Sequence, residues 1–123
     1  MQMLLPVMVG GALGAGLRHL LNLAAPHGLL PWSTLLANIL GGVAMGFLFG
    51  WLHRSGAGEF WRYFLGVGLL GGFTTFSAFS METLSMLGSG RFGIAATYIL
   101  LSLAGAIGGA AIGIWLARVG AVT

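Results

Sequence analysis

Gly71-Gly72-Phe73-Thr74-Thr75-Phe76-Ser77-Ala78-Phe79-Ser80 is the most unusual stretch of this chain, because it puts polar groups in the middle of an apolar segment. Two glycines followed by two β-branched threonines make a poor helix interior, and four hydroxyls in seven residues are hard to satisfy in hydrocarbon. A break in the helix is the simplest physical solution. Such a break would free carbonyl groups that can ligate a small cation, and N–H groups that favour an anion.

The rest of the chain carries almost no charge. Of 123 residues, 58% are hydrophobic and 6% are charged, with five arginines, two glutamates and no lysine, and the mean hydropathy is +1.00. A soluble domain needs roughly a quarter of its residues charged, and disordered segments are poor in apolar side chains, so both classes are excluded. The absence of cysteine excludes disulfides and thiol chemistry. The scattered arginines form no basic stripe for nucleic acid. The composition indicates an integral membrane protein.

Apolar runs long enough to cross a bilayer recur along the whole chain. A spanning helix needs about 20 such residues, and continuous rather than alternating runs argue against a β-barrel. Short turns rich in Gly, Pro and Ser separate the runs, so neighbouring helices should be antiparallel. We predict an all-α membrane protein with a single four-helix transmembrane domain, the third helix broken near its middle, and spans at about 2–24, 31–53, 61–87 and 91–118.

The arginines give little preference for one orientation in the membrane. With four spans, Arg54, Arg62 and Arg118 fall on one face, and Arg18 and Arg91 on the other. Because an excess of Lys and Arg normally marks the cytoplasmic face, a near tie predicts insertion both ways. The alternative is that three against two still selects one orientation. If both orientations coexist, the natural assembly is an antiparallel homodimer of separate chains.

Small residues recur at helical spacing in two of the spans. These series are Gly42, Gly46 and Gly50 in the second span, and Gly105, Gly109 and Gly113 in the fourth. Glycine at intervals of four lets helix backbones approach closely in lipid. We therefore interpret both series as helix-packing surfaces.

Polar and aromatic residues at membrane depth are candidates for a site. Asn38, near the middle of the second span, could serve an anion or bridge two helices. Phe76 and Phe79 lie three residues apart, and their positively polarised ring edges could line an anion path without a fixed charge. The alternative for this pair is ordinary core packing. No nucleophile–base pair, paired carboxylates or phosphate-binding loop is visible, and the histidines lack ligand spacing, so we predict that the chain is not an enzyme.

The chain resembles the CrcB, or Fluc, fluoride channels over essentially its whole length. The resemblance rests on residues 11–15 with Arg18, on Asn38 followed by Gly41, and on residues 71–77 followed by Phe79. It implies a dual-topology homodimer in the bacterial cytoplasmic (inner) membrane that passively exports fluoride. It further implies two anion paths per dimer and one central structural Na⁺ that is not transported.

The resemblance also assigns roles to individual residues. The backbone carbonyls of Gly71 and Thr74 would hold the sodium ion, Arg18 would lie in the vestibule, and Glu82 would be a carboxylate at the mouth. The residues implied in the fluoride path are Asn38, Phe76, Phe79, Thr34, Thr75, Ser77, Tyr98 and Ser102. Ala106 stands where some members carry a further serine, which leaves the outer end of this polar line open.

Two other functions are compatible with a small four-helix membrane protein. One is a dual-topology multidrug or cation exporter, which needs a membrane-embedded carboxylate to exchange protons. The first span has none, and Glu82 is expected near a span end. The other is a non-conducting assembly subunit, whose polar patch would only pack helices.

Overall fold

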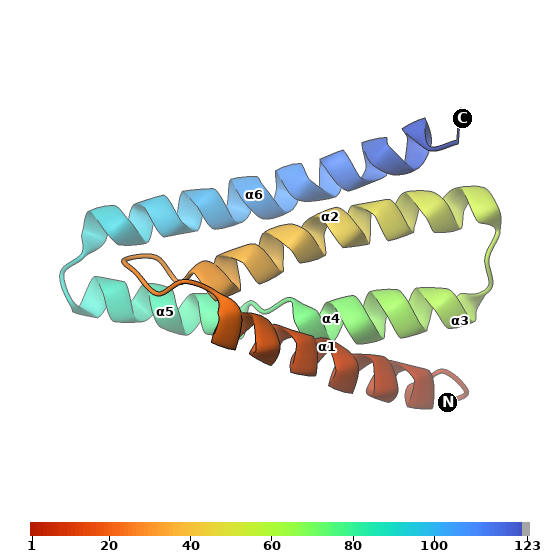
Figure 1. The fold of residues 1–123 in the computed structure, drawn as a ribbon, viewed down its shortest axis with the longest axis horizontal. Helices are drawn as coiled ribbons and strands as arrows, with labels where there is room; N and C mark the ends of the chain where they lie inside the picture. Colours follow the sequence, from red (N-terminus) through yellow and green to blue (C-terminus); the bar gives the residue numbers. More distant parts are fainter. Residues whose placement is uncertain (122–123) are drawn as a thin grey trace.

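The computed structural model describes residues 1–121, and within that range every regular element is helical. Four helical segments are long and apolar enough to cross a membrane, which confirms the predicted all-α class and multi-pass character. They are α1 (Leu4–Ala24), α2 (Trp32–Ser55), the compound segment Glu59–Gly88, and α6 (Phe92–Val119). The start of α1 and the end of α6 lie at the same end of the bundle (Figure 1).

The third segment is built from four pieces. These are α3 (Glu59–Trp61), the π-helical η1 (Arg62–Leu70), α4 (Gly71–Phe73) and α5 (Ser77–Gly88). The sequence did not indicate the π-helical geometry, which widens the backbone spiral before the glycine pair. Residues 74–76 lie outside any helix, and Thr74 is extended, with φ −82° and ψ 156°. The polypeptide therefore crosses the middle of this segment without a continuous helical hydrogen-bond ladder.

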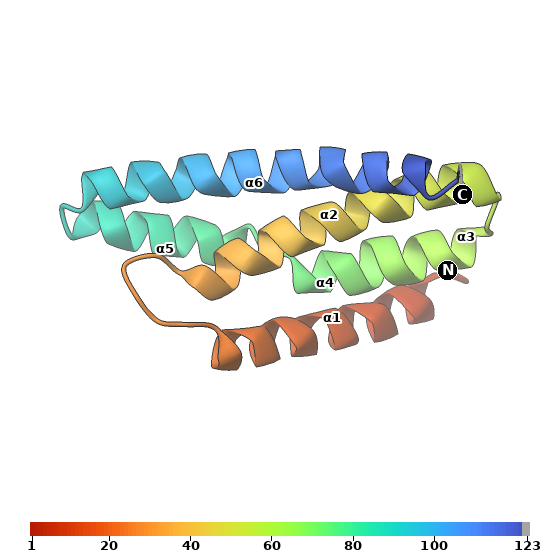
Figure 2. The ribbon, with the colours of Figure 1, turned by 45° about the horizontal axis from the view of Figure 1, so that its top comes forward.

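The helices pack mainly as two pairs. The long helices α2 and α6 run along each other, while α1 packs along η1 and α4 (Figures 1 and 2). Backbone contact through glycine makes the first pair close: a Cβ on Gly46 would overlap the carbonyl oxygen of Ala110, and one on Gly113 would overlap that of Val43. The interpretation of these glycines as a packing surface is confirmed, and their contact fixes the position of α2 along the axis of α6.

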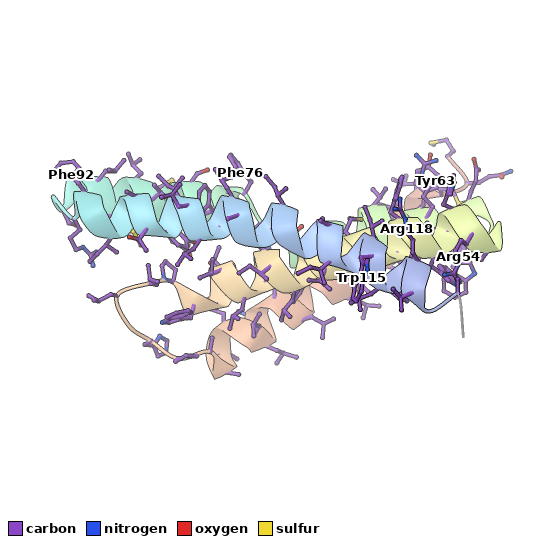
Figure 3. All side chains as sticks on the ribbon, turned by 90° about the horizontal axis from the view of Figure 1, so that it is seen from above. Arg54, Tyr63, Phe76, Phe92, Trp115 and Arg118 are labelled. Carbon is purple, nitrogen blue, oxygen red and sulfur yellow. The ribbon has the colours of Figure 1, made fainter. Side chains whose placement is uncertain are left out.

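An arginine stabilises the end of the bundle where α1 begins and α6 ends. The guanidinium of Arg54, at the end of α2, donates a hydrogen bond to the backbone carbonyl of Ala117, at the end of α6. Figure 3 shows Arg54 and Arg118 at this same end. A cation is favourable at a helix C-terminus, where carbonyl groups lack partners within the helix. Arg54 therefore joins the ends of the two longest apolar helices.

The main cluster of buried apolar side chains is small and lies towards the other end of the bundle. It consists of Leu35, Phe79, Met86, Ala95 and Tyr98. Large apolar side chains elsewhere point outward on every spanning helix, as expected for helices that contact lipid or another subunit. Close helix packing, rather than a large core, is what holds the four spans together.

We expect Gly113→Ala to destabilise the fold. The added methyl group would meet the Val43 carbonyl and push α6 away from α2, at a cost of about 2 kcal/mol. Thermal or denaturant unfolding of the purified protein in detergent measures this loss.

Gly93→Ala is the matched control, because Gly93 lies on the same helix and an added Cβ meets no atom within 4 Å. This control should be neutral, or stabilising by up to about 1 kcal/mol through helix propensity. Equal unfolding midpoints for the two variants would contradict close packing at Gly113.

Candidate functional site

The non-helical residues 74–76 lie opposite Asn38 of α2, whose amide bonds the exposed backbone. The Asn38 side-chain nitrogen donates to the Thr75 carbonyl at 2.9 Å, and the Thr75 N–H donates to the Asn38 side-chain oxygen at 2.9 Å. A backbone group without a partner inside a membrane costs several kcal/mol. One side chain therefore satisfies both backbone polar groups of Thr75, a residue that lies outside any helix.

Hydroxyl groups beside these bonds complete the local structure. The Thr74 hydroxyl donates to the Leu70 carbonyl at 2.9 Å, which ends α4. The Thr75 hydroxyl accepts a bond from the Ala78 N–H at 3.2 Å and lies 3.2 Å from the Ser77 hydroxyl, so Thr75 caps the start of α5. Threonine and serine thus stabilise the ends that the interruption creates.

Several carbonyls beside the interruption lose their usual helical donors, and those of Gly71 and Thr74 are among them. In an unbroken helix, the Gly71 carbonyl would bond the N–H of Thr75, and the Thr74 carbonyl would bond the N–H of Ala78. Here the Thr75 N–H bonds Asn38 and the Ala78 N–H bonds the Thr75 hydroxyl. The oxygens of Gly71 and Thr74 are therefore available to another partner.

Three aromatic rings form a row that begins beside the interruption. The ring centroids of Phe76 and Phe79 are 5.6 Å apart, and those of Phe79 and Tyr98 are 5.3 Å apart. Tyr98 is fully buried and Phe79 is buried, whereas Phe76 is 76% exposed. Figure 3 shows Phe76 projecting away from the helices. The row therefore runs from the interior to an exposed face of the molecule.

Glu82 joins two of the expected path residues in a hydrogen-bonded cluster. The Thr34 hydroxyl donates to Glu82 Oε1 at 2.8 Å, and the Tyr98 hydroxyl donates to Glu82 Oε2 at 2.6 Å. The sequence suggested a position near a span end, but Glu82 lies within α5, six residues before Gly88 at its end. It approaches Thr34 and Tyr98 only because α2, α5 and α6 meet here, which spacing along the chain does not reveal.

Ser102 carries a hydroxyl that has no partner within residues 1–121. Its side chain is 6% exposed and lines a cavity of about 340 Å³. The cavity is also lined by Asn38, Thr75, Phe76, Phe79 and Ala106, among others. A buried hydroxyl left unbonded costs free energy, so Ser102 is suited to bind something that enters the cavity.

Arg18 lines a separate, smaller cavity, which shares Thr75 with the cavity of Ser102. This cavity has a volume of about 230 Å³, and Thr34, Thr75 and Glu82 also contribute to its wall. Arg18 is half-buried on α1, and neither it nor any other arginine among residues 1–121 forms an ion pair with a glutamate. The site thus combines one free cation with neutral donors and the hydrogen-bonded Glu82.

The structure gathers the expected path residues into one region. Asn38, Thr75, Phe76, Phe79 and Ser102 surround the larger cavity, and Thr34 and Tyr98 lie at Glu82. Ser77 is exposed and touches this region through Thr75. No group of three or more His, Asp or Glu side chains within residues 1–121 could hold a metal ion. Any cation here would depend on backbone oxygens.

Comparison with known proteins gives a consistent result. A family model described as "CrcB-like protein, Camphor Resistance (CrcB)" matches residues 5–114. A protein of Novosphingobium aromaticivorans is 44% identical over 117 residues (91% of this chain, 93% of the relative). One of Sphingopyxis alaskensis is 53% identical over 111 residues (87% and 88%), and one of Phenylobacterium zucineum is 51% identical over 123 residues (96% and 97%). All three are named fluoride-specific ion channel FluC.

We expect Asn38→Asp to destabilise the protein even before any transport is measured. A carboxylate keeps an acceptor for the Thr75 N–H but loses the donor to the Thr75 carbonyl. One carboxylate oxygen would then face the Thr75 carbonyl oxygen, and the two would repel each other. The loss should be about 2 kcal/mol in the free energy of unfolding, measured in detergent.

The same substitution at Asn22 is the control. Asn22 is exposed, and its side-chain oxygen only accepts a bond from the Ser33 hydroxyl, which an aspartate can still accept. Asn22→Asp should change the unfolding free energy by no more than about 0.5 kcal/mol. If Asn38→Asp were equally harmless, the Asn38 side chain would not be the partner that stabilises the backbone groups of Thr75.

Proposed function

The chain belongs to the CrcB family, and from this premise we propose that it is a fluoride-selective ion channel that passively exports fluoride. The observation that carries the proposal is the row of neutral donors and aromatic rings that connects the larger cavity with Glu82. Such a row can accept a small anion at membrane depth without a fixed cation that would trap it. The relatives are named as channels, so no catalytic step is involved.

The chemistry of the path follows from the cost of removing water from fluoride. Fluoride is small and strongly hydrated, so a path must supply hydrogen-bond donors that replace its water. The unbonded Ser102 hydroxyl is one such donor, and the Asn38 amide has a second N–H beyond the one that bonds Thr75. The edges of Phe76 and Phe79 add weak positive polarisation. Each of these contacts is weak enough to let the ion move on.

We propose that the working unit is an antiparallel homodimer with two paths, in a bacterial inner membrane. The near tie of arginines between the two faces supports insertion both ways. The exposure of Phe76 supports a second subunit, because a large aromatic side chain at the edge of the cavity is then covered by protein. On this proposal the helix interruption lies where two copies meet, so that both protomers contribute to each path.

We further propose that a sodium ion holds the two interruptions together. Na⁺ prefers oxygen ligands, and the carbonyls of Gly71 and Thr74 lack the helical donors that would otherwise bond them. Gly71 is also exposed on the protomer, so its backbone is accessible to an ion shared with a second copy. The ion would supply positive charge between facing carbonyls and thereby stabilise the dimer.

The direct test is transport by the purified protein in lipid vesicles. Wild-type protein should release fluoride and retain chloride. Phe79→Ile should abolish fluoride release because it removes the ring that links Phe76 to Tyr98, while the residue stays apolar and the dimer stays intact by gel filtration.

Phe92→Ile is the matched control, because Phe92 is exposed at the start of α6. It lines neither the cavity of Ser102 nor that of Arg18. It should release fluoride as the wild type does. A folded wild-type protein that releases no fluoride would instead indicate a non-conducting subunit, and drug-coupled proton exchange would indicate an exporter.

Removal of sodium should weaken the dimer. Without a cation, the facing carbonyls would repel each other, and the dissociation constant of the dimer should rise by about tenfold or more. The dimer–monomer equilibrium can be measured by energy transfer between labelled protomers, with Na⁺ replaced by K⁺ at equal ionic strength so that screening is unchanged. A dissociation constant indifferent to this exchange would count against the carbonyl site.

A further inference from the structure

An opening beside Glu82 has an arginine on its wall, and this arginine lies outside the set of path residues. This cavity, of about 490 Å³, lies at the end of the bundle formed by the 25–31 loop, the start of α2 and the 88–91 turn. Its polar lining consists of Asn22, His27, Ser33, Glu82, Ser85 and Arg91. Since Glu82 also bonds Thr34 and Tyr98, the cavity begins where the hydrogen-bonded cluster ends.

Arg91 is held at this opening by the turn that precedes α6. Gly90 adopts a left-handed conformation, with φ 74°, which side chains other than glycine rarely allow. The Arg91 N–H then donates to the Met86 carbonyl at 2.9 Å, and the Arg91 carbonyl accepts from the Ala95 N–H at 3.0 Å. Both sides of the Arg91 backbone are therefore fixed, and the side chain leaves from a rigid position.

The charge of Arg91 is not neutralised by a neighbour. Its side chain is exposed, and within the described part of the chain it forms no salt bridge, although Glu82 lines the same cavity. Glu82 carries the same sign as an approaching anion when it is ionised. An unpaired cation at the outer wall opposes that repulsion where it would otherwise keep anions out.

Two openings therefore reach Glu82 from different sides. The cavity beside Arg18 and the cavity beside Arg91 share Asn22, Ser33 and Glu82, but their volumes are about 230 and 490 Å³. The wider opening has room for an anion that still carries its water. The family resemblance implies a vestibule at Arg18, whereas Arg91 was considered only for its bearing on orientation in the membrane.

We propose that the Arg91 cavity is a mouth of the fluoride path, and that Arg91 raises the local fluoride concentration there by its charge. The proposal rests on the proposed channel function. Arg91 acts through its long-range field rather than by binding a dehydrated ion, because its side chain is exposed to solvent. Such attraction is strong at low ionic strength and screened at high ionic strength.

The test is single-channel fluoride conductance in planar bilayers of zwitterionic lipid, which contribute no surface charge. Arg91→Gln should lower the conductance about threefold at an ionic strength of about 10 mM, where the screening length is about 30 Å. At about 1 M, set with an impermeant gluconate salt, the screening length falls to about 3 Å and the variant should match the wild type.

Two further variants separate charge from shape. Arg91→Lys keeps the charge and should conduct as the wild type does at both ionic strengths. Arg118→Gln removes the same charge from an exposed residue that lines neither cavity; in an antiparallel dimer it shares a membrane face with the partner's Arg91, so it should lower the conductance less than Arg91→Gln does. Gel filtration establishes that each variant is folded before its conductance is compared.

Each possible result bears on the proposal. A folded Arg91→Gln that conducts normally at low ionic strength would overturn it, as would a deficit that persists at about 1 M or an equal deficit in Arg91→Lys. In all these cases the wild type still conducts fluoride, and the channel function stands. A wild type that passes no fluoride would overturn the channel function itself, and the role of Arg91 with it.

Discussion

The two hydrogen bonds between Asn38 and the backbone of Thr75 are the interaction on which the rest of the structure depends. Hydrocarbon offers no water to an exposed peptide group, so a chain can leave the helical conformation there only if protein supplies the missing partners. Asn38 provides a donor and an acceptor 2.9 Å from the same residue. Its neutral amide carries the donor and the acceptor on separate atoms, so that it bonds an N–H and a carbonyl at the same time without charge.

This interaction in turn requires that α2 have the correct axial position relative to residues 74–76 of the third segment. The close contacts of Gly46 and Gly113 fix the position of α2 on α6, and a hydrogen bond from the Arg54 side chain joins the C-terminal ends of these two helices. A shift of one helical turn, about 5.4 Å, would carry Asn38 out of reach of Thr75. Packing between apolar helices thus determines whether the polar region can exist at all.

Much of this arrangement could be predicted from the sequence, for physical reasons that differ between features. Length and apolar composition determine that a segment must be a spanning helix, so the four helices were predictable. The cluster of Glu82 with Thr34 and Tyr98 was not, because it depends on how three helices rotate against one another. The π-helical turns of η1 and the place of Arg91 on a cavity wall are likewise products of packing.

The start of α1 and the end of α6 lie at the same end of the bundle, which has a consequence for linking two copies. Because an even number of crossings returns the polypeptide to its starting side, joining the tail of one copy to the head of the next would insert both in the same direction (Figure 1). A covalently linked pair with opposed copies would need one additional crossing between them. Opposed pairing of the kind proposed is therefore most simply made from unlinked translation products of a single gene.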